Sequence, residues 1–239
     1  MKERAQSFGR VAADYDRVRP SYPPEVIAWL LAEAPGRDVV DVGAGTGKMT
    51  RALREAGYDV VAVEPDAGMR ALNPGALEGS GEHLPLPDAS VDAIVYAQSW
   101  HWVEPVAALA EARRVLRPGG VLAAAWNYED PDSDWITDVG VAAGSDRSVI
   151  PVPLAGDVPI PAFVGIEGDR TFRHRWSRAL TVDDLAQLVQ TWSWVSTRPS
   201  DEQARIVDDV RAIVTPRAID GRLDVPMVTV CRRVTLSSR

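Results

Sequence analysis

The stretch from Val39 to Thr50, VVDVGAGTGKMT, constrains the fold of this chain more than any other. Its apolar start, residues 39–42, predicts a buried strand, and glycines then occupy alternate positions up to a helix that begins near Lys48. Because glycine has no Cβ, the backbone can turn sharply there and come close to a bound molecule. The free N–H groups of the first helical turn face the same place. We therefore expect a ligand site where this strand ends.

The spacing of the glycines separates the known kinds of glycine-rich turn. A dinucleotide fingerprint, G-x-G-x-x-G, requires a third glycine where this chain has Lys48. A P-loop requires Ser or Thr after that lysine, and Met49 follows instead. What remains is G-x-G-x-G after an acid, formed by Asp41, Gly43, Ala44, Gly45 and Gly47.

Strand and helix patterns alternate along the rest of the chain. Predicted strands cover 39–42, 59–64, 91–97 and 121–126, with 76–78 as a weaker candidate, and predicted helices cover 25–34, 48–57, 66–72 and 105–116. This alternation predicts a parallel, doubly wound α/β sheet. Beyond residue 127 we expect loop with one short helix near Trp135, and then a strand at 171–180, helices at 181–191 and 201–214, and a strand at 225–234. Thr181 has the position of an N-cap, and the two late strands suit an antiparallel edge.

Length and charge bound the kind of partner. A chain of 239 residues can bury one domain with a small addition. Its net charge of −8 disfavours a nucleic-acid partner, because binding to phosphate backbones needs basic surface. We find no signal peptide or membrane span in the sequence, and the single Cys231 allows no intrachain disulfide. These features predict a cytoplasmic protein that acts on small molecules, with no nucleic-acid, membrane or metal partner.

A second acidic residue stands where a nucleoside would need it. Glu64 closes the strand that follows the glycine turn, at the position where a carboxylate meets the ribose across the crevice of such a sheet. Both NAD and S-adenosylmethionine carry a ribose. Glu64 therefore predicts a nucleoside ligand without choosing between the two.

The segment GSGEHLPLPDASVDAIVYAQSWHW, residues 79–102, and the later VLRPGGVLAAAWN resemble the class I S-adenosylmethionine-dependent methyltransferases of the type 11 group. This group includes the ubiquinone and menaquinone C-methyltransferases and trans-aconitate methyltransferase, and the resemblance covers residues 36–127. It implies a three-layer αβα fold with a mostly parallel, seven-stranded sheet of Rossmann-like type and an antiparallel edge strand. It also implies S-adenosylmethionine as cofactor and S-adenosylhomocysteine as product.

In that family the loop before the fourth strand holds the adenine. Ser80 and Gly81 replace the usual Asp and Ala there, and Glu82 matches a common family acid. Met69, Leu84 and Trp100 are apolar candidates to pack on the purine or in the core. The expected cofactor-binding residues are Asp41, Gly43, Ala44, Gly45, Gly47, Glu64, Pro65, Met69, Ser80, Gly81, Glu82 and Gln98.

The acceptor is expected at the end of the strand that covers 91–97, beside the transferable methyl. The WHW sequence there and the leader's YDRVRPSYP are similar to trans-aconitate methyltransferase and its relatives. Residues 1–24 are expected to form a cap or arm before a methyltransferase domain at 25–239, whose core is 36–127 and whose substrate-side elements are 128–180. The expected acceptor residues are Tyr15, Arg19, Tyr22, Ser99, Trp100 and His101, and His174 or Arg175 are further candidates to pair with a carboxylate.

His101 is the candidate general base, because an unperturbed histidine suits proton removal from a hydroxyl or carbon acid. It could instead orient a loop or cap the helix near Val103. A carboxylate acceptor would need no base. Three functions stay open: a methyltransferase for a small carboxylate, hydroxyl or carbon acceptor, a non-catalytic protein that binds the cofactor or its product, and an NAD-dependent oxidoreductase. The chain is expected to act as a monomer or homodimer.

Overall fold

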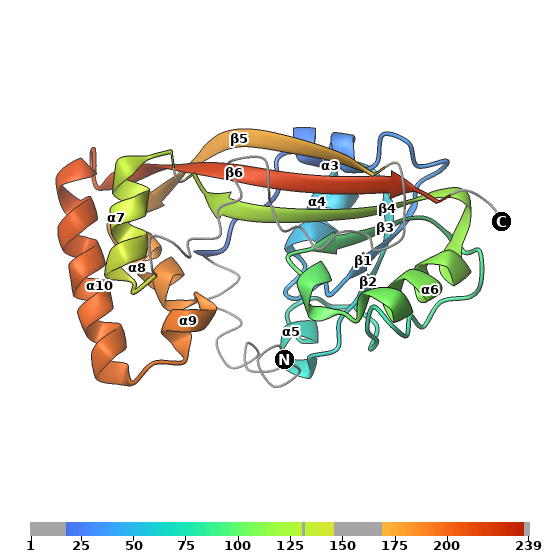
Figure 1. Ribbon diagram of the computed structural model, residues 1–239, viewed down its shortest axis with the longest axis horizontal. Helices are drawn as coiled ribbons and strands as arrows, with labels where there is room; N and C mark the ends of the chain where they lie inside the picture. Colours follow the sequence, from blue (N-terminus) through green and yellow to red (C-terminus); the bar gives the residue numbers. More distant parts are fainter. Residues whose placement is uncertain (1–17, 131, 146–168, 237–239) are drawn as a thin grey trace.

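The computed structural model describes residues 18–130, 132–145 and 169–236. Within them, one sheet of six strands runs through the molecule in the order β2-β1-β3-β4-β6-β5 (Figure 1). The strands are β1 (Asp38–Val42), β2 (Asp59–Val63), β3 (Val91–Ala97), β4 (Leu116–Glu129), β5 (Arg170–Thr181) and β6 (Arg222–Thr235). The first four are parallel, and β6 is antiparallel to both of its neighbours, β4 and β5. The predicted mostly parallel sheet is confirmed, with its antiparallel strand one position inside the edge.

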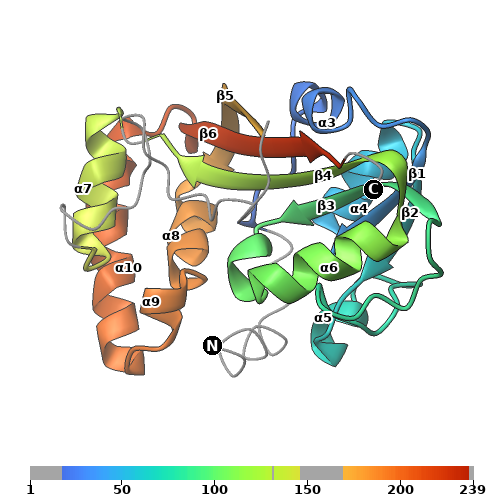
Figure 2. The same ribbon diagram turned by 45° about the vertical axis from the view of Figure 1, so that its right-hand side comes forward.

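Helices cover both faces of the sheet (Figure 2). Those beside the parallel strands are α3 (Pro24–Leu30), α4 (Lys48–Glu55), α5 (Ala67–Arg70), the 3-10 turn η2 (Trp100–Trp102) and α6 (Pro105–Val115). The hydrophobic core on one face is shared with α3 and α4, and the core on the other is shared with α6. This is the three-layer αβα arrangement expected from the sequence. None of the helices in the described ranges is long and apolar enough to cross a membrane.

The central strands have apolar residues at most positions because both of their faces are buried. In β3, Ala93 and Val95 pack in the core under α3 and α4, whereas Ile94 and Tyr96 pack in the core under α6. Side chains alternate between the two faces of a strand, so a parallel strand covered on both faces reads as a continuous apolar run.

A separate group of helices packs at the far ends of β5 and β6, at the left of Figure 1. It consists of α7 (Asp134–Ala142), α8 (Val182–Gln190), α9 (Ser193–Ser196), α10 (Ser200–Val214) and the short turn η3 (Thr215–Arg217). These helices enclose their own hydrophobic core, which includes Leu185, Leu188 and Leu223. The predicted N-cap of α8 is confirmed, because Thr181 Oγ1 accepts a hydrogen bond of 3.0 Å from the Asp184 N–H.

Three expectations need correction. The described residues contain six strands, and the weak candidate at 76–78 makes only a single parallel bridge, between Val63 and Leu77. Gly79 ends this segment where the chain passes so close to the Val63 side chain that a Cβ would lie 2.8 Å from it. Strand β4 begins at Leu116, before the predicted strand at 121–126, and its register with β3 shifts between the pairs Val91–Leu116 and Ala93–Val121. Helix α9 was not expected.

Candidate active site

The glycine turn lies at the topological switch point of the sheet. The chain passes from β1 to β2 on one side of β1 and then crosses to β3 on the other side. The carboxyl end of β1 therefore lies between the carboxyl ends of β2 and β3. In open α/β sheets, ligands bind at this point. Gly47 is the N-cap of α4, and its φ of 87° lies in the left-handed region. Strand, turn and helix are arranged as the sequence predicts.

Two of the glycines are required by close neighbours, and one faces open space. A Cβ on Gly43 would lie 2.5 Å from Ser99 Cβ, and one on Gly47 would lie 2.7 Å from Asn73 Cγ. At Gly45, no heavy atom in the described part of the chain lies within 4 Å of the Cβ position. The turn therefore leaves room for a ligand at its centre.

Asp41 is a buried carboxylate with one oxygen in use. Its Oδ2 accepts a hydrogen bond of 2.6 Å from Thr50 Oγ1, which in turn accepts one of 3.3 Å from Asn73 Nδ2. Its Oδ1 is buried and has no hydrogen-bond partner among residues 18–130, 132–145 and 169–236. Burial raises the pKa of Asp41 to about 7, and the nearby carboxylate of Glu64 acts in the same direction. A buried carboxylate oxygen without a partner favours a cationic ligand group.

Glu64 joins the glycine turn to the segment after β2. Its Oε2 accepts a hydrogen bond of 2.8 Å from the Gly45 N–H, and its Oε1 accepts one of 2.8 Å from the Asp66 N–H. The residue is 6% exposed, and burial raises its pKa. Each carboxylate oxygen has a second lone pair, so the carboxylate is held in place by the backbone and can still accept from a ligand hydroxyl.

Two further expected cofactor residues follow Glu64 directly. Pro65 lies between Glu64 and the N-cap of α5, where its carbonyl accepts from Arg70 Nη1 at 2.8 Å. Met69 is buried within α5, and its N–H donates to Asp66 Oδ1 at 2.9 Å. The structure therefore brings both residues to the same end of β2 as Glu64.

The predicted adenine loop is held in place by its backbone. The N–H and C=O groups of Ser80 and His83 bond each other reciprocally at 3.1 Å, and Glu82 Oε1 accepts from the Glu104 N–H at 2.8 Å, at the start of α6. A Cβ on Gly81 would lie 3.0 Å from the Tyr96 hydroxyl oxygen and 2.7 Å from Val103 Cγ1. This crowding explains glycine where related proteins have alanine.

The tail of β3 reaches the glycine turn. Ser99 Oγ donates a hydrogen bond of 2.6 Å to the Val42 carbonyl, the last residue of β1. Gln98 has a left-handed φ of 57°, and its Nε2 donates to the Asn127 carbonyl at 2.8 Å. Left-handed φ in a residue other than glycine is uncommon and concentrates at functional sites. Gln98 and Ser99, two of the expected site residues, therefore link the end of β3 to β1 and β4, its neighbours in the sheet.

Trp100 packs in the core. Its side chain is fully buried, and its ring lies edge-on against Tyr96 with 4.9 Å between the centroids. The structure shows the core role, and the expected place of Trp100 beside the acceptor stays a prediction. Leu84 belongs to the same core cluster.

His101 follows Trp100 and is exposed on one side of η2. Its ring lies against Trp102, with 4.7 Å between the centroids, and its Nδ1 accepts a hydrogen bond of 3.2 Å from Trp126 Nε1. Partial burial by these neighbours lowers the pKa of His101. The residue therefore contacts both Trp102 and Trp126 at the carboxyl edge of the sheet, two residues after the contact with β1.

The described part of the leader is tied to the rest of the molecule. Arg19 makes two hydrogen bonds to Thr191. Its Nε donates to the hydroxyl at 3.0 Å, and its Nη2 donates to the carbonyl at 2.9 Å. Tyr22 is buried in the core under α3. These contacts anchor the segment, whereas Tyr15 lies outside the described residues. Neither Arg19 nor Tyr22 is shown against an acceptor, and their predicted roles stay predictions.

Sequence reasoning missed a buried polar network that holds the leader from the other side. Trp176 Nε1 donates to Thr229 Oγ1 at 2.9 Å, Thr229 Oγ1 donates to Asn127 Oδ1 at 2.5 Å, and Asn127 Nδ2 donates to the Ser21 carbonyl at 3.1 Å. Its signal in the sequence is a polar residue, Asn127 or Thr229, within a strand that is otherwise largely apolar. Sequence reasoning also missed Thr50, which donates to Asp41, and Asn73, which donates to Thr50.

Arg178 was also missed. It is half-buried on β5, its Nη2 donates to the Val18 carbonyl at 2.8 Å, and its buried Nε has no hydrogen-bond partner in the described part of the chain. Burial lowers its pKa, and the nearby charge of Arg19 acts in the same direction. His174 and Arg175 face other partners, since His174 Nε2 lies 3.8 Å from Glu25 Oε2 and Arg175 Nε lies 3.0 Å from Asp130 Oδ2.

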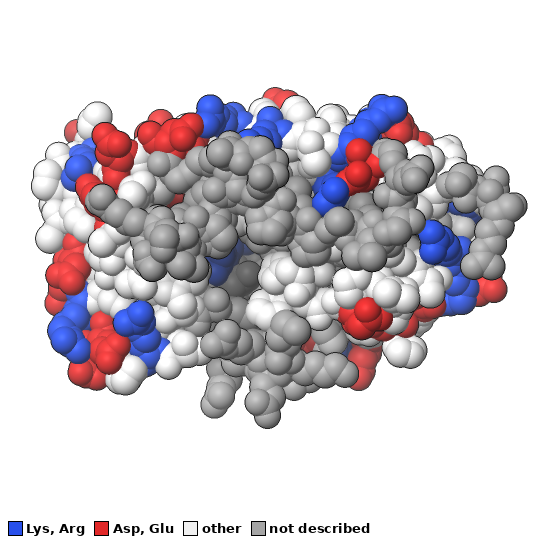
Figure 3. All heavy atoms as spheres, viewed as in Figure 1, with Lys and Arg blue, Asp and Glu red and all other residues white. Residues whose placement is uncertain are grey.

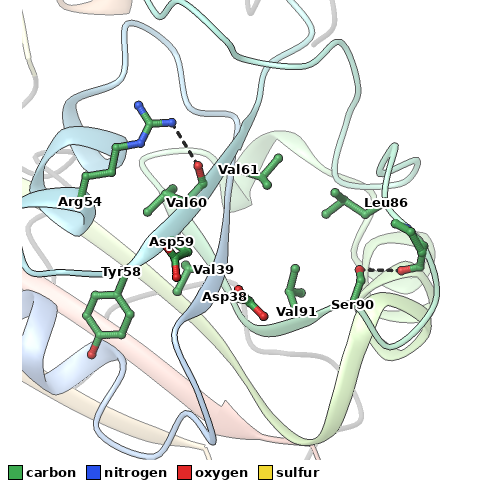
Figure 4. A pocket seen from close by; sticks show the side chains of 11 residues that line it. Asp38, Val39, Arg54, Tyr58, Asp59, Val60, Val61, Leu86, Ser90 and Val91 are labelled. Atoms are coloured by element: carbon green, nitrogen blue, oxygen red, sulfur yellow. Dashed lines mark hydrogen bonds between the residues drawn. The ribbon is translucent and has the colours of Figure 1, made fainter.

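A broad cavity of about 660 Å³ lies at the opposite edge of the sheet (Figure 4). Its lining comes from the amino ends of β1, β2 and β3, including Asp38, Asp59 and Val91, and at one side the guanidinium of Arg54 donates to the Val60 carbonyl at 3.0 Å. The glycine turn and Glu64 are at the carboxyl ends of the same strands, so this cavity is not the ligand site. In the face shown in Figure 3, atoms of Lys or Arg are visible near the middle of the view.

The fold and the site together define a class of protein. A switch-point glycine turn, a buried acid at the end of β1 and a backbone-held acid at the end of β2 form the arrangement expected for class I methyltransferases. A family model described as a methyltransferase domain matches residues 40–124. The chain belongs to the class I S-adenosylmethionine-dependent methyltransferases of the type 11 group.

Similar proteins cover the whole chain. An uncharacterised methyltransferase of Mycobacterium tuberculosis is 42% identical, over 99% of this chain and 98% of its own length. A solved structure described as a type II methyltransferase from Anaeromyxobacter dehalogenans superposes with a TM-score of 0.61 at 26% identity, over 92% of this chain and 99% of that one. A malonyl-[acyl-carrier protein] O-methyltransferase of Pectobacterium atrosepticum is 37% identical over 50% of this chain and 51% of its own length.

Proposed function

We propose that this methyltransferase binds S-adenosylmethionine at the glycine turn through Asp41, Gly45 and Glu64, and that it methylates a carboxylate oxygen of a small acceptor. The observation that carries the cofactor site is the pair of buried carboxylates that converge on one open turn. The acceptor class rests on other observations.

The residues at the turn fit the cofactor. Glu64 is held by two backbone N–H groups and keeps lone pairs for the two ribose hydroxyls. The unpartnered Oδ1 of Asp41 suits the ammonium group of the methionine part. The open space at Gly45 lets the ligand lie against the backbone.

The bound cofactor would supply a methyl group on a sulfonium, which is already a good leaving group. The chain then has to align the acceptor in line with that methyl and exclude water. Ser99 serves this need indirectly, because its bond to the Val42 carbonyl fixes the tail of β3 against the glycine turn.

A carboxylate acceptor is supported by charge. Burial lowers the pKa of Arg178, the nearby charge of Glu129 raises it and that of Arg19 lowers it, and the buried Nε of Arg178 has no hydrogen-bond partner in the described part of the chain. Two neighbouring guanidinium groups favour an anion between or beside them. The malonyl-[acyl-carrier protein] O-methyltransferases, which match half of this chain, are named for methyl transfer to oxygen.

Calorimetric titration with S-adenosylmethionine, S-adenosylhomocysteine and NAD tests the cofactor site. We expect micromolar binding of the two sulfur nucleosides and a loss of tenfold or more in Glu64→Gln, which keeps the size of the side chain and removes its charge. Glu78→Gln is the matched control, because the Glu78 carboxylate is exposed and pairs with Arg70. Binding of NAD alone, or equal affinities in wild type and Glu64→Gln, would contradict the assignment.

A screen with methyl-labelled S-adenosylmethionine tests the acceptor. It compares dicarboxylic acids and malonyl-acyl carrier protein with hydroxyl analogues and with quinone precursors. Labelled ester, released as methanol by mild alkali, is expected only with the acids, and Arg178→Gln should raise the KM for them. A base-stable product on a hydroxyl or carbon acceptor would refute the carboxylate. Tight cofactor binding with no transfer to any class would favour a non-catalytic binding protein.

A further inference from the structure

The residues on either side of His101 in the sequence and in space are buried or hydrogen-bonded. Trp100 before it is fully buried against Tyr96, and Ser99 bonds to the end of β1. Trp126, on β4, is 4% exposed and belongs to the same core. The hydrogen bond from Trp126 Nε1 to His101 Nδ1 therefore joins two side chains with little freedom to move apart.

This hydrogen bond decides where the proton of His101 lies. An indole N–H can only donate, so Nδ1 must present its lone pair to Trp126. A neutral imidazole with an unprotonated Nδ1 carries its proton on Nε2. The other tautomer would set an Nδ1–H against the indole N–H and leave the nearly buried Trp126 donor without an acceptor.

We propose that Trp126 fixes His101 in the Nε2–H tautomer, so that His101 donates a hydrogen bond to an oxygen of the acceptor and does not remove a proton from it. This role differs from the general base expected from the sequence, and it rests on the proposed methyl transfer. It deepens that function, because a hydrogen-bond donor at this place suits an acceptor from which no proton has to be removed. A carboxylate, with one oxygen held by His101 and the other free to attack the methyl, meets this requirement.

Histidine-selective ¹⁵N NMR of the whole protein, with S-adenosylhomocysteine present, tests the tautomer directly. The chain has three histidines, so His101→Gln assigns the signal by removing it. We expect a protonated Nε2 and an unprotonated Nδ1 for His101 at pH 8, and a mixture of tautomers in Trp126→Phe. Trp102→Phe is the matched control, since Trp102 contacts the same ring through a tilted ring–ring contact, and it should leave the tautomer unchanged. A protonated Nδ1 in the wild type overturns the proposal.

Rates with the best acceptor of the screen test the donor role. The amide nitrogen of glutamine can take the place of the histidine Nε2–H, but glutamine cannot act as a base. We expect His101→Gln to stay within about tenfold of the wild-type kcat/KM and His101→Ala to fall well below it. Equal losses of about a hundredfold or more in both variants would show a base, because general base catalysis is typically worth that much.

The two proposals can fail separately. If no acceptor is methylated, the proposed function fails, while the NMR experiment still decides the tautomer. If carboxylates are methylated and Nδ1 carries the proton, only the role of Trp126 is refuted.

Discussion

Replacing Asp41 by Asn should make the cofactor-free protein more stable at alkaline pH while weakening the cofactor site. Asn keeps an oxygen that accepts from Thr50 Oγ1 and removes a charge that is fully buried. Burial raises the pKa of Asp41 to about 7, against roughly 4 in an unfolded chain. Above pH 7 the folded protein must therefore hold an ionised carboxylate in a place that disfavours it.

The size and sign of the effect follow from proton linkage. As the pH falls through 7, the folded protein takes up a proton before the unfolded chain does, so the wild type gains stability that is lost again as the pH rises through 7. Three pKa units correspond to about 4 kcal/mol over the whole range. Between pH 8.5 and pH 5.5 the wild type should gain about 2 kcal/mol relative to Asp41→Asn, which has no such group.

Urea unfolding followed by tryptophan fluorescence at pH 5.5, 7 and 8.5 measures this difference. Asp59→Asn is the matched control, because Asp59 begins the neighbouring strand β2 and is exposed. A stability difference between Asp41→Asn and wild type that is the same at pH 5.5 and 8.5 would refute the reasoning. In calorimetry, the stabilised Asp41→Asn should bind S-adenosylhomocysteine at least tenfold more weakly, since it no longer offers a charge to the ammonium group.

Three other substitutions separate binding from stability. Gly45→Ala should weaken S-adenosylhomocysteine binding about tenfold or more in calorimetry, because its methyl enters the open turn. Gly75→Ala is the control, because Gly75 also has a positive φ and no described atom near its Cβ position; it should show only the strain, roughly 1 kcal/mol in urea unfolding. Thr181→Ala removes the N-cap of α8 and should cost about 1 kcal/mol in urea unfolding with no change in the calorimetric affinity; an unchanged urea midpoint would contradict the cap. Thr229→Val keeps the shape but leaves the Trp176 donor without its acceptor, and should cost roughly 1–3 kcal/mol; a neutral result in urea unfolding would show that the network is dispensable.

Much of the parallel half of the fold is predictable because its signals are local. The apolar runs at β1, β2 and β3, the glycines between them and the acids that close β1 and β2 are all legible within a few residues of one another. The late strands and the cap of α8 were found in the same way. A candidate such as 76–78 failed because three residues between turn residues carry too little periodicity, and the structure extends it to only one bridge.

The sequence by itself determined the class of fold, the ligand turn and the two carboxylates beside it, because glycine conformation and strand-end acids are properties of short segments. Only the tertiary structure decided which atoms meet across the sheet: Thr50 on one oxygen of Asp41, and the indole of Trp126 on His101. It also placed β6 between β4 and β5, and with it Arg178 beside the leader. These contacts join residues that are far apart in the chain or set on different elements. They depend on sheet order and packing, which no short stretch of sequence encodes.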